Sequence, residues 1–174
     1  MDDAGSWGLM TCAAQQTTWT CISRSEAQTV RLGEAIGKTA RARDVVALIG
    51  PLGVGKTQMA RGIACGLGVP DAAISSPTFT LLQTYAGCLS LHHIDLYRWA
   101  GDEVGLSEAI EGDGVAVVEW ADRGMDLLPM ARLILTLRYA EGDLREIVLT
   151  GDGPRGVAWL AQLEQIWKTS EHGR

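Results

Sequence analysis

One short stretch, residues 50–57 with the sequence GPLGVGKT, constrains this chain more than any other. It fits the pattern G-x-x-x-x-G-K-[ST], in which glycines let several backbone N–H groups turn toward one anion. Lys56 would reach the β- and γ-phosphates of a nucleotide, and the hydroxyl of Thr57 would bind Mg²⁺. The predicted phosphate-binding residues are Leu52, Gly53, Val54, Gly55, Lys56, Thr57 and Gln58.

The sequence on either side of this loop supplies the context that the motif requires. Residues 44–49 form an apolar run with the length of a buried strand. After the loop, Met59, Ile63 and Leu67 recur at helical spacing, and Gly66 with Gly68-Val69-Pro70 would stop the helix. The N-terminus of this helix would add its unpaired N–H groups and its dipole to the phosphate site. The strand, loop and helix together predict nucleotide binding.

Composition limits the remaining possibilities. The 174 residues are 47% hydrophobic, which is enough for one domain with its own core. A net charge of −6 argues against a nucleic-acid-binding surface over the whole chain. No apolar run approaches the ~20 residues of a membrane span, and the acidic start at Met1–Asp3 is unlike a signal peptide. The four cysteines are scattered and form no C-x-x-C pair, which argues against a zinc site. For a chain with a nucleotide loop we expect free thiols in a reducing cytoplasm, and no contact with a membrane.

Apolar runs define the expected fold class. Residues 45–49 and 115–118 are continuously apolar, as in parallel strands that are covered on both faces. Further strands are predicted at 17–22, 79–85, 89–95, 133–139 and 145–150, the last four as two antiparallel hairpins. Helices are predicted from Ser25 to Gly37, after the loop, around 106–110 and from 157 onward.

The expected architecture is therefore α/β, a three-layer P-loop NTPase-like fold. Its mixed, largely parallel central sheet would carry the added antiparallel hairpins. Residues 1–16 are predicted as a loose N-terminal tail, 17–168 as a single domain and 169–174 as a C-terminal tail.

Two acids at predicted strand ends could serve a metal ion or a water beside the loop. Glu119 directly follows the apolar run 115–118, and Asp95 ends the alternating strand 89–95. Because the strand of Glu119 is the more apolar, we assign Glu119 to Mg²⁺ and Asp95 to positioning or polarising the attacking water. The alternative for either acid is a solvated strand end. His93 shares a strand face with Asp95, where a histidine is more often packed than catalytic.

A hydroxyl-rich loop and one tryptophan complete the candidate site. Thr78 and Thr80 follow Pro77 and could reach the γ-phosphate, as switch loops do. The residues alone equally allow an ordinary turn around a proline. Trp120, next to Glu119, could stack on a base, although the residues alone favour core packing for it.

The motifs occur together in an order that resembles the bacterial TsaE family. Residues 50–57 are followed by SPTFTL at 76–81, HIDLYR at 93–98 and EW at 119–120. A phosphate loop occurs in very many families, whereas these later motifs are much more restrictive. The similarity runs from about residue 19 to 150 and implies the P-loop ATPase of threonylcarbamoyladenosine (t6A) biosynthesis, with ATP and Mg²⁺ as ligands.

The resemblance also implies partners and residue roles. It implies a complex with TsaD-type and TsaB-type proteins that forms t6A at position 37 of tRNA, so that tRNA is contacted indirectly. ATP hydrolysis, slow without these partners, would reset the complex between turnovers. The implied catalytic residues are Lys56, Asp95, Thr78 and Thr80, the implied magnesium ligands are Thr57 and Glu119, and Trp120 resembles the family's adenine-stacking residue. Pro51 departs from the acidic residue usual at its position, but it contributes only a backbone group to the cradle.

Two other functions stay open from the sequence. A small-molecule P-loop kinase usually carries several arginines in a lid over the phosphates, and the arginines after the loop show no such cluster. A GTPase is disfavoured because the chain has no N-K-x-D motif. A non-catalytic, nucleotide-dependent interaction module would need Lys56 and Thr57 but not Asp95.

Overall fold

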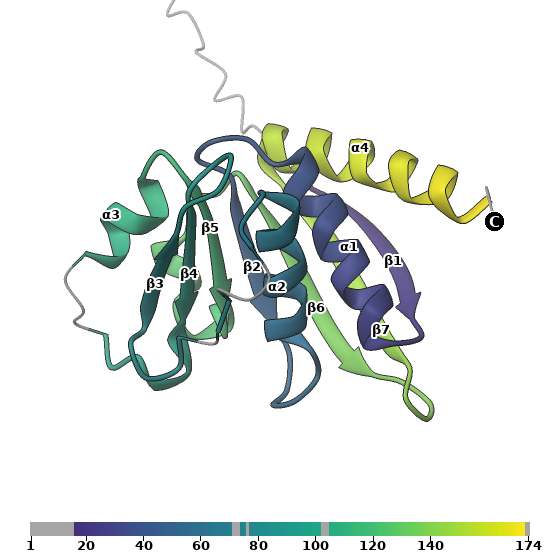
Figure 1. Ribbon diagram of the computed structural model, residues 1–174, viewed down its shortest axis with the longest axis horizontal. Helices are drawn as coiled ribbons and strands as arrows, with labels where there is room; N and C mark the ends of the chain where they lie inside the picture. The colour runs from purple at the N-terminus through teal and green to yellow at the C-terminus, as the bar shows by residue number, and fades with distance from the viewer. Residues whose placement is uncertain (1–15, 71–73, 76, 102–104, 173–174) are drawn as a thin grey trace, which may run out of the picture.

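The computed structural model describes residues 16–70, 74–75, 77–101 and 105–172, which form a seven-stranded mixed sheet covered by helices (Figure 1). The strands are β1 (Gln16–Ser23), β2 (Val45–Ile49), β3 (Leu82–Tyr85), β4 (Leu91–Asp95), β5 (Val115–Glu119), β6 (Arg132–Tyr139) and β7 (Arg145–Asp152). The helices are α1 (Glu26–Thr39), α2 (Lys56–Gly66), α3 (Leu106–Glu111) and α4 (Gly153–His172). None of the described helices is long and apolar enough to cross a membrane.

The sheet is parallel at its centre and antiparallel at its edges. Its strand order is β1-β7-β6-β2-β5-β4-β3. Strands β6, β2, β5 and β4 run parallel to one another, whereas β7 pairs antiparallel with β6, β1 with β7, and β3 with β4. The two continuously apolar runs of the sequence lie side by side as β2 and β5, with Val46 opposite Val117. The predicted mixed, largely parallel sheet is therefore confirmed.

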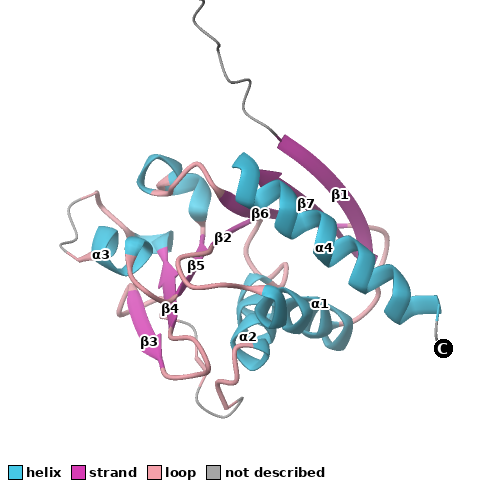
Figure 2. Ribbon diagram, turned by 90° about the horizontal axis from the view of Figure 1, so that it is seen from above, coloured by secondary structure: helices cyan, strands magenta, loops and turns pink. Residues whose placement is uncertain are grey.

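Two separate apolar cores lie on the two faces of the sheet, which confirms the three-layer α/β architecture. Val46 and Leu48 of β2 face the core under α1, α2 and α4. Val45 and Ala47 alternate with them and face the core under α3. Figure 2 shows α1, α2 and α4 on one side of the sheet and α3 on the other. Burial on both faces explains why β2 and β5 contain apolar residues without alternation.

Glycines bring α1 and α2 into backbone contact. A β-carbon at Gly37 would lie 2.2 Å from the carbonyl oxygen of Ile63, and one at Gly33 would lie 2.5 Å from that of Met59. The prediction that Gly37 ends the first helix is therefore wrong, because α1 continues to Thr39. Gly37 allows the two helices to approach rather than ending one of them. This packing places the start of α1 near the start of α2.

Some predicted boundaries shift in the structure. The strand expected at 79–85 begins only at Leu82, because the N–H groups of Thr80 and Leu81 donate to the carbonyl of Pro77 and form a turn. Strand β1 begins at Gln16, and α4 continues past 168 to His172. Most of the predicted N-terminal tail, residues 1–15, lies outside the described residues, as does Ser76.

Candidate nucleotide-binding site

The loop between β2 and α2 depends on glycines in left-handed backbone conformations. Gly53 and Gly55 have φ angles of 74° and 113°, which side chains of L-residues rarely tolerate. Gly55 is the N-cap of α2, and Lys56 is the first helical residue. Because glycine has no side chain, no side-chain cap occupies the first N–H groups of the helix. The first N–H groups of α2 therefore stay available for an anion that enters the loop.

The Lys56 side chain is nearly buried and folds back over this loop. Its Nζ donates to the carbonyl oxygens of Gly50 at 2.7 Å and Pro51 at 2.9 Å, and the residue is 4% exposed. Burial lowers the pKa of the Lys56 ammonium below its ordinary value of 10.5, while the negative charges of Glu119 and Asp95 act in the opposite direction. The cation is held by neutral carbonyl groups that phosphate oxygens could replace.

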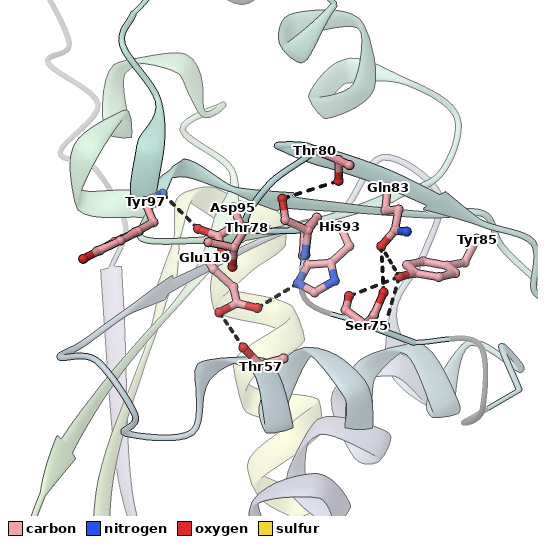
Figure 3. A network of polar contacts seen from close by, with 11 residues as sticks. Thr57, Ser75, Thr78, Thr80, Gln83, Tyr85, His93, Asp95, Tyr97 and Glu119 are labelled. Carbon is pink, nitrogen blue, oxygen red and sulfur yellow. Dashed lines mark hydrogen bonds and ion pairs between the residues drawn. The ribbon is translucent and has the colours of Figure 1, made fainter.

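Thr57, Glu119 and His93 form a hydrogen-bonded chain beside the loop (Figure 3). The Thr57 hydroxyl donates to Glu119 Oε2 at 3.0 Å, and Glu119 Oε1 lies 2.8 Å from His93 Nε2. A hydroxyl and a carboxylate are the hard oxygen ligands that Mg²⁺ prefers, with phosphate oxygens and water completing its shell. Thr57 and Glu119 therefore fit the metal ion that was assigned to them.

Asp95 lies beside Glu119 because the two residues are neighbours in the register of β4 and β5. Its Oδ2 accepts a hydrogen bond from the Thr78 hydroxyl at 2.8 Å, and its Oδ1 accepts one from the backbone N–H of Tyr97 at 2.9 Å. Thr80 is placed differently, since it is exposed and its hydroxyl lies 3.5 Å from the Pro77 carbonyl (Figure 3). A catalytic role for Thr80 stays a prediction.

Trp120 covers the Lys56 end of the site. The centre of its ring lies 3.6 Å from Lys56 Nζ and 4.9 Å from the centre of the Tyr97 ring. The Arg123 guanidinium lies 5.3 Å from the Trp120 ring and 4.9 Å from that of Tyr97. The Trp120 backbone is left-handed, with φ 55°, which turns the chain directly after Glu119. Lys56 is expected at the β- and γ-phosphates, so adenine stacking on Trp120 would require the base to approach that end, and it stays a prediction.

A single pocket of about 390 Å³ brings most of the candidate residues together. Its lining comprises Glu26, Leu52, Gly53, Gly55, Lys56, Thr57, Gln58, Thr78, Asp95, Tyr97, Glu119 and Trp120. Of the predicted site residues, Val54 and Thr80 are not among them. Val54 lines an adjoining pocket of about 210 Å³, which shares Glu26, Gly53, Gly55 and Gln58 with the first.

Sequence reasoning missed three residues of this region. Tyr97 lies within the HIDLYR motif, so a signal was present but was not assigned to the pocket. His93 lies in the same motif and was expected to be packed. Glu26 gave no signal, because it reaches the pocket only through the packing of α1 against α2.

Comparisons with known proteins identify the family. The family model described as "Threonylcarbamoyl adenosine biosynthesis protein TsaE" matches residues 23–147. Two similar proteins are named tRNA threonylcarbamoyladenosine biosynthesis protein TsaE. The one from Treponema pallidum is 41% identical over 133 residues, 74% of this chain and 98% of its own length. The one from Bacillus subtilis is 38% identical over 144 residues, 81% of this chain and 89% of its own length.

A solved structure agrees with the sequence comparisons. The crystal structure of Bacillus subtilis YdiB superposes on this fold with a TM-score of 0.72 at 33% sequence identity. The superposition covers 87% of this chain and 96% of YdiB. The family resemblance that the motifs predict is therefore confirmed, and the chain belongs to the TsaE family of threonylcarbamoyl adenosine biosynthesis proteins.

Proposed function

We propose that this protein is a Mg²⁺-dependent ATPase that acts in the cytoplasm with TsaD-type and TsaB-type proteins to form t6A at position 37 of tRNA. Its ATP hydrolysis would reset that complex between turnovers, and tRNA would be contacted through the partners. One observation carries the ATPase proposal: a single pocket is lined by Lys56, Thr57, Asp95 and Glu119. Those four residues are the minimum set for binding phosphate, holding a metal ion and orienting a water.

The buried residues of the pocket would bind the phosphates. Lys56 Nζ would exchange its two carbonyl acceptors, Gly50 and Pro51, for phosphate oxygens. Thr57 and Glu119 would hold the Mg²⁺, which when bound neutralises negative charge on the phosphates. The hydrogen bond between Thr57 and Glu119 supports assigning the metal to Glu119 and not to Asp95, because Glu119 is the acid already paired with the loop threonine.

Asp95 would then orient the attacking water. Both of its carboxylate oxygens accept hydrogen bonds, from Thr78 and from the Tyr97 backbone, so its direction is set before any ligand binds. An oriented carboxylate at the edge of a phosphate site can accept a proton from water or hold it in line. The hydroxyl of Thr78 would link this acid to the segment that follows Pro77.

The mouth of the pocket supports a role for partner proteins. Leu52, 72% exposed, and Tyr97, 37% exposed, line the pocket and also face solvent. Contiguous exposed apolar patches are typical of surfaces that other proteins cover, and these two side chains would contribute to such a patch. A partner seated here would exclude water from the pocket, which strengthens its electrostatic interactions with phosphate.

The test is ATP hydrolysis by the full chain, measured alone and with purified TsaD-type and TsaB-type proteins. We expect slow phosphate release alone, a clear increase with the partners, and loss of the Mg²⁺-dependent increase in Glu119→Ala. A phosphorylated small molecule would instead indicate a kinase, and tight binding without turnover under all conditions would indicate an interaction module. Deleting the gene should remove t6A from cellular tRNA, and unchanged t6A would contradict the assignment to this pathway.

A further inference from the structure

His93 is a fully buried polar residue directly behind the proposed magnesium ligand. It is 0% exposed, and its Nε2 lies 2.8 Å from Glu119 Oε1. The register of the parallel pair β4 and β5 places His93 opposite Val117, two residues before Glu119, so the two side chains lie on one face of the sheet. Burying an imidazole among apolar neighbours is costly unless its polar atoms are used. The hydrogen bond to Glu119 satisfies one of the two ring nitrogens, Nε2.

The second ring nitrogen indicates which tautomer is present. Within the described part of the chain, His93 Nδ1 has no hydrogen-bond partner. A hydrogen on Nδ1 would be a buried donor without an acceptor, and Nε2 would then face Glu119 Oε1 with two lone pairs opposed. The neutral tautomer with its hydrogen on Nε2 avoids both costs. The imidazole therefore donates to Glu119.

Glu119 is consequently held at both carboxylate oxygens. Thr57 donates to Oε2 from the loop, and His93 donates to Oε1 from the neighbouring strand. One donor on each oxygen limits rotation of the carboxylate, which lines the pocket. Groups that hydrogen-bond to metal ligands orient them in this way, and their removal commonly costs about 10–100-fold in metal affinity.

We infer that His93 is a positioning residue that holds the Glu119 carboxylate beside Thr57 through its Nε2–H, and so sets the affinity of the pocket for a magnesium–nucleotide complex. This inference rests on the proposed function of the pocket. His93 itself touches neither nucleotide nor metal, because Glu119 stands between them.

The chain offers matched variants for the test. His93→Gln places an amide donor near the position of Nε2, and His93→Met fills a similar volume without a donor. His92 is the control, because it is the adjacent residue of β4 and its Nδ1 lies 3.2 Å from the Thr84 hydroxyl on the other face of the strand. His92→Gln should leave every property of the pocket unchanged.

The measurement is calorimetric binding of ATPγS in EDTA and across a Mg²⁺ titration, accompanied by thermal unfolding. We expect His93→Met to need about 10–100-fold more Mg²⁺ to reach half of the full Mg²⁺-induced increase in ATPγS affinity. Its affinity for ATPγS in EDTA should stay near that of the wild type. His93→Gln should recover most of the difference. Wild-type Mg²⁺ dependence in a folded His93→Met, or the same loss in both variants, would overturn the inference and indicate a packing role.

Two further outcomes keep the question decidable. If Mg²⁺ does not tighten ATPγS binding to the wild-type chain, the proposed function of the pocket fails rather than the role of His93. If His93→Met does not fold, imidazole ¹⁵N NMR of the wild-type protein decides. A hydrogen on Nε2 supports the inference, and a ring that carries its hydrogen on Nδ1 alone overturns it.

Discussion

The pocket has two halves that are built differently. The inner half comprises Lys56, Thr57, His93, Asp95 and Glu119, whose side chains are joined by hydrogen bonds or by charge and of which four are no more than 4% exposed. The outer half comprises Leu52, Phe79 and Tyr97, which line the pocket or directly follow a residue that does, and Phe79 is 83% exposed.

The difference separates chemistry from recognition. Buried hydrogen bonds and charges are costly to rearrange, so the inner half is organised before a ligand arrives. The outer half is held by ring contacts at the surface, such as the Arg98 guanidinium 4.8 Å from the Phe79 ring. Such contacts are worth about 0.5–1 kcal/mol at exposed sites and can be exchanged for a partner. Substitutions should therefore have large effects in the inner half and small ones in the outer half.

The largest effect should come from Lys56→Met. It removes a cation expected to make two charged hydrogen bonds to phosphate, each worth about 1.5–3 kcal/mol, so nucleotide affinity should fall by about 10²–10⁴-fold. The melting temperature should not fall, because an apolar side chain avoids the cost of burying a charge. Calorimetric binding and thermal unfolding measure both.

Lys38→Met is the control for this change, since the Lys38 side chain is 65% exposed at the end of α1 and should alter neither property. A wild-type affinity in Lys56→Met would remove Lys56 from the phosphate site and would end the distinction between the two halves.

Asp95→Asn should have the next largest effect, on turnover rather than on binding. Asparagine keeps an acceptor for the Tyr97 N–H but loses the carboxylate that would orient water, so kcat should fall by about 10²–10⁴-fold. Affinity for ATP with Mg²⁺ should change little, because Glu119 holds the metal. An equal loss of ATP binding would show that Asp95 and Glu119 share the metal. The control is Asp126→Asn, because Asp126 is an exposed residue.

Titration of the Lys56 ammonium should make both folding stability and phosphate affinity depend on pH. Burial lowers its pKa below 10.5 in the folded, ligand-free protein. As the pH rises through that lowered pKa toward 10.5, folding is favoured because the unfolded chain still binds the proton. Phosphate affinity should fall over the same range, because a neutral amine attracts phosphate less. Binding measured from pH 7 to 10 tests this, and Lys56→Arg should remove the decline because arginine keeps its charge.

The inner half was largely predictable from the sequence because its signals are local. The glycines, Lys56 and Thr57 form one continuous motif, Glu119 directly follows an apolar run, and Asp95 ends an alternating strand. Parallel strands then bring those ends to one edge of the sheet, so Asp95 and Glu119 become neighbours without any sequence signal between them. The strand ends predict which acids lie at that edge, whereas the pairing of β4 with β5 decides that these two are neighbours.

Contacts that depend on packing between distant elements were not predictable. Glu26 reaches the pocket because four glycines let α1 and α2 touch, and a glycine that permits contact looks the same in sequence as one that ends a helix. His93 was predictable as a buried histidine but not as a donor to Glu119, because its partner lies on another strand. Sequence patterns describe single elements, whereas these roles belong to pairs of elements.

The smallest effect should separate two threonines that the sequence could not distinguish. Thr78→Val removes the hydroxyl that orients Asp95, so hydrolysis should fall on the order of tenfold. Thr80→Val changes an exposed residue outside the pocket, and its effect should stay within about twofold. Phosphate release by both variants with the partner proteins is the measurement. A larger loss in Thr80→Val would mean that nucleotide or partner binding draws residues 77–81 into the pocket, because only then could an exposed hydroxyl contact the γ-phosphate.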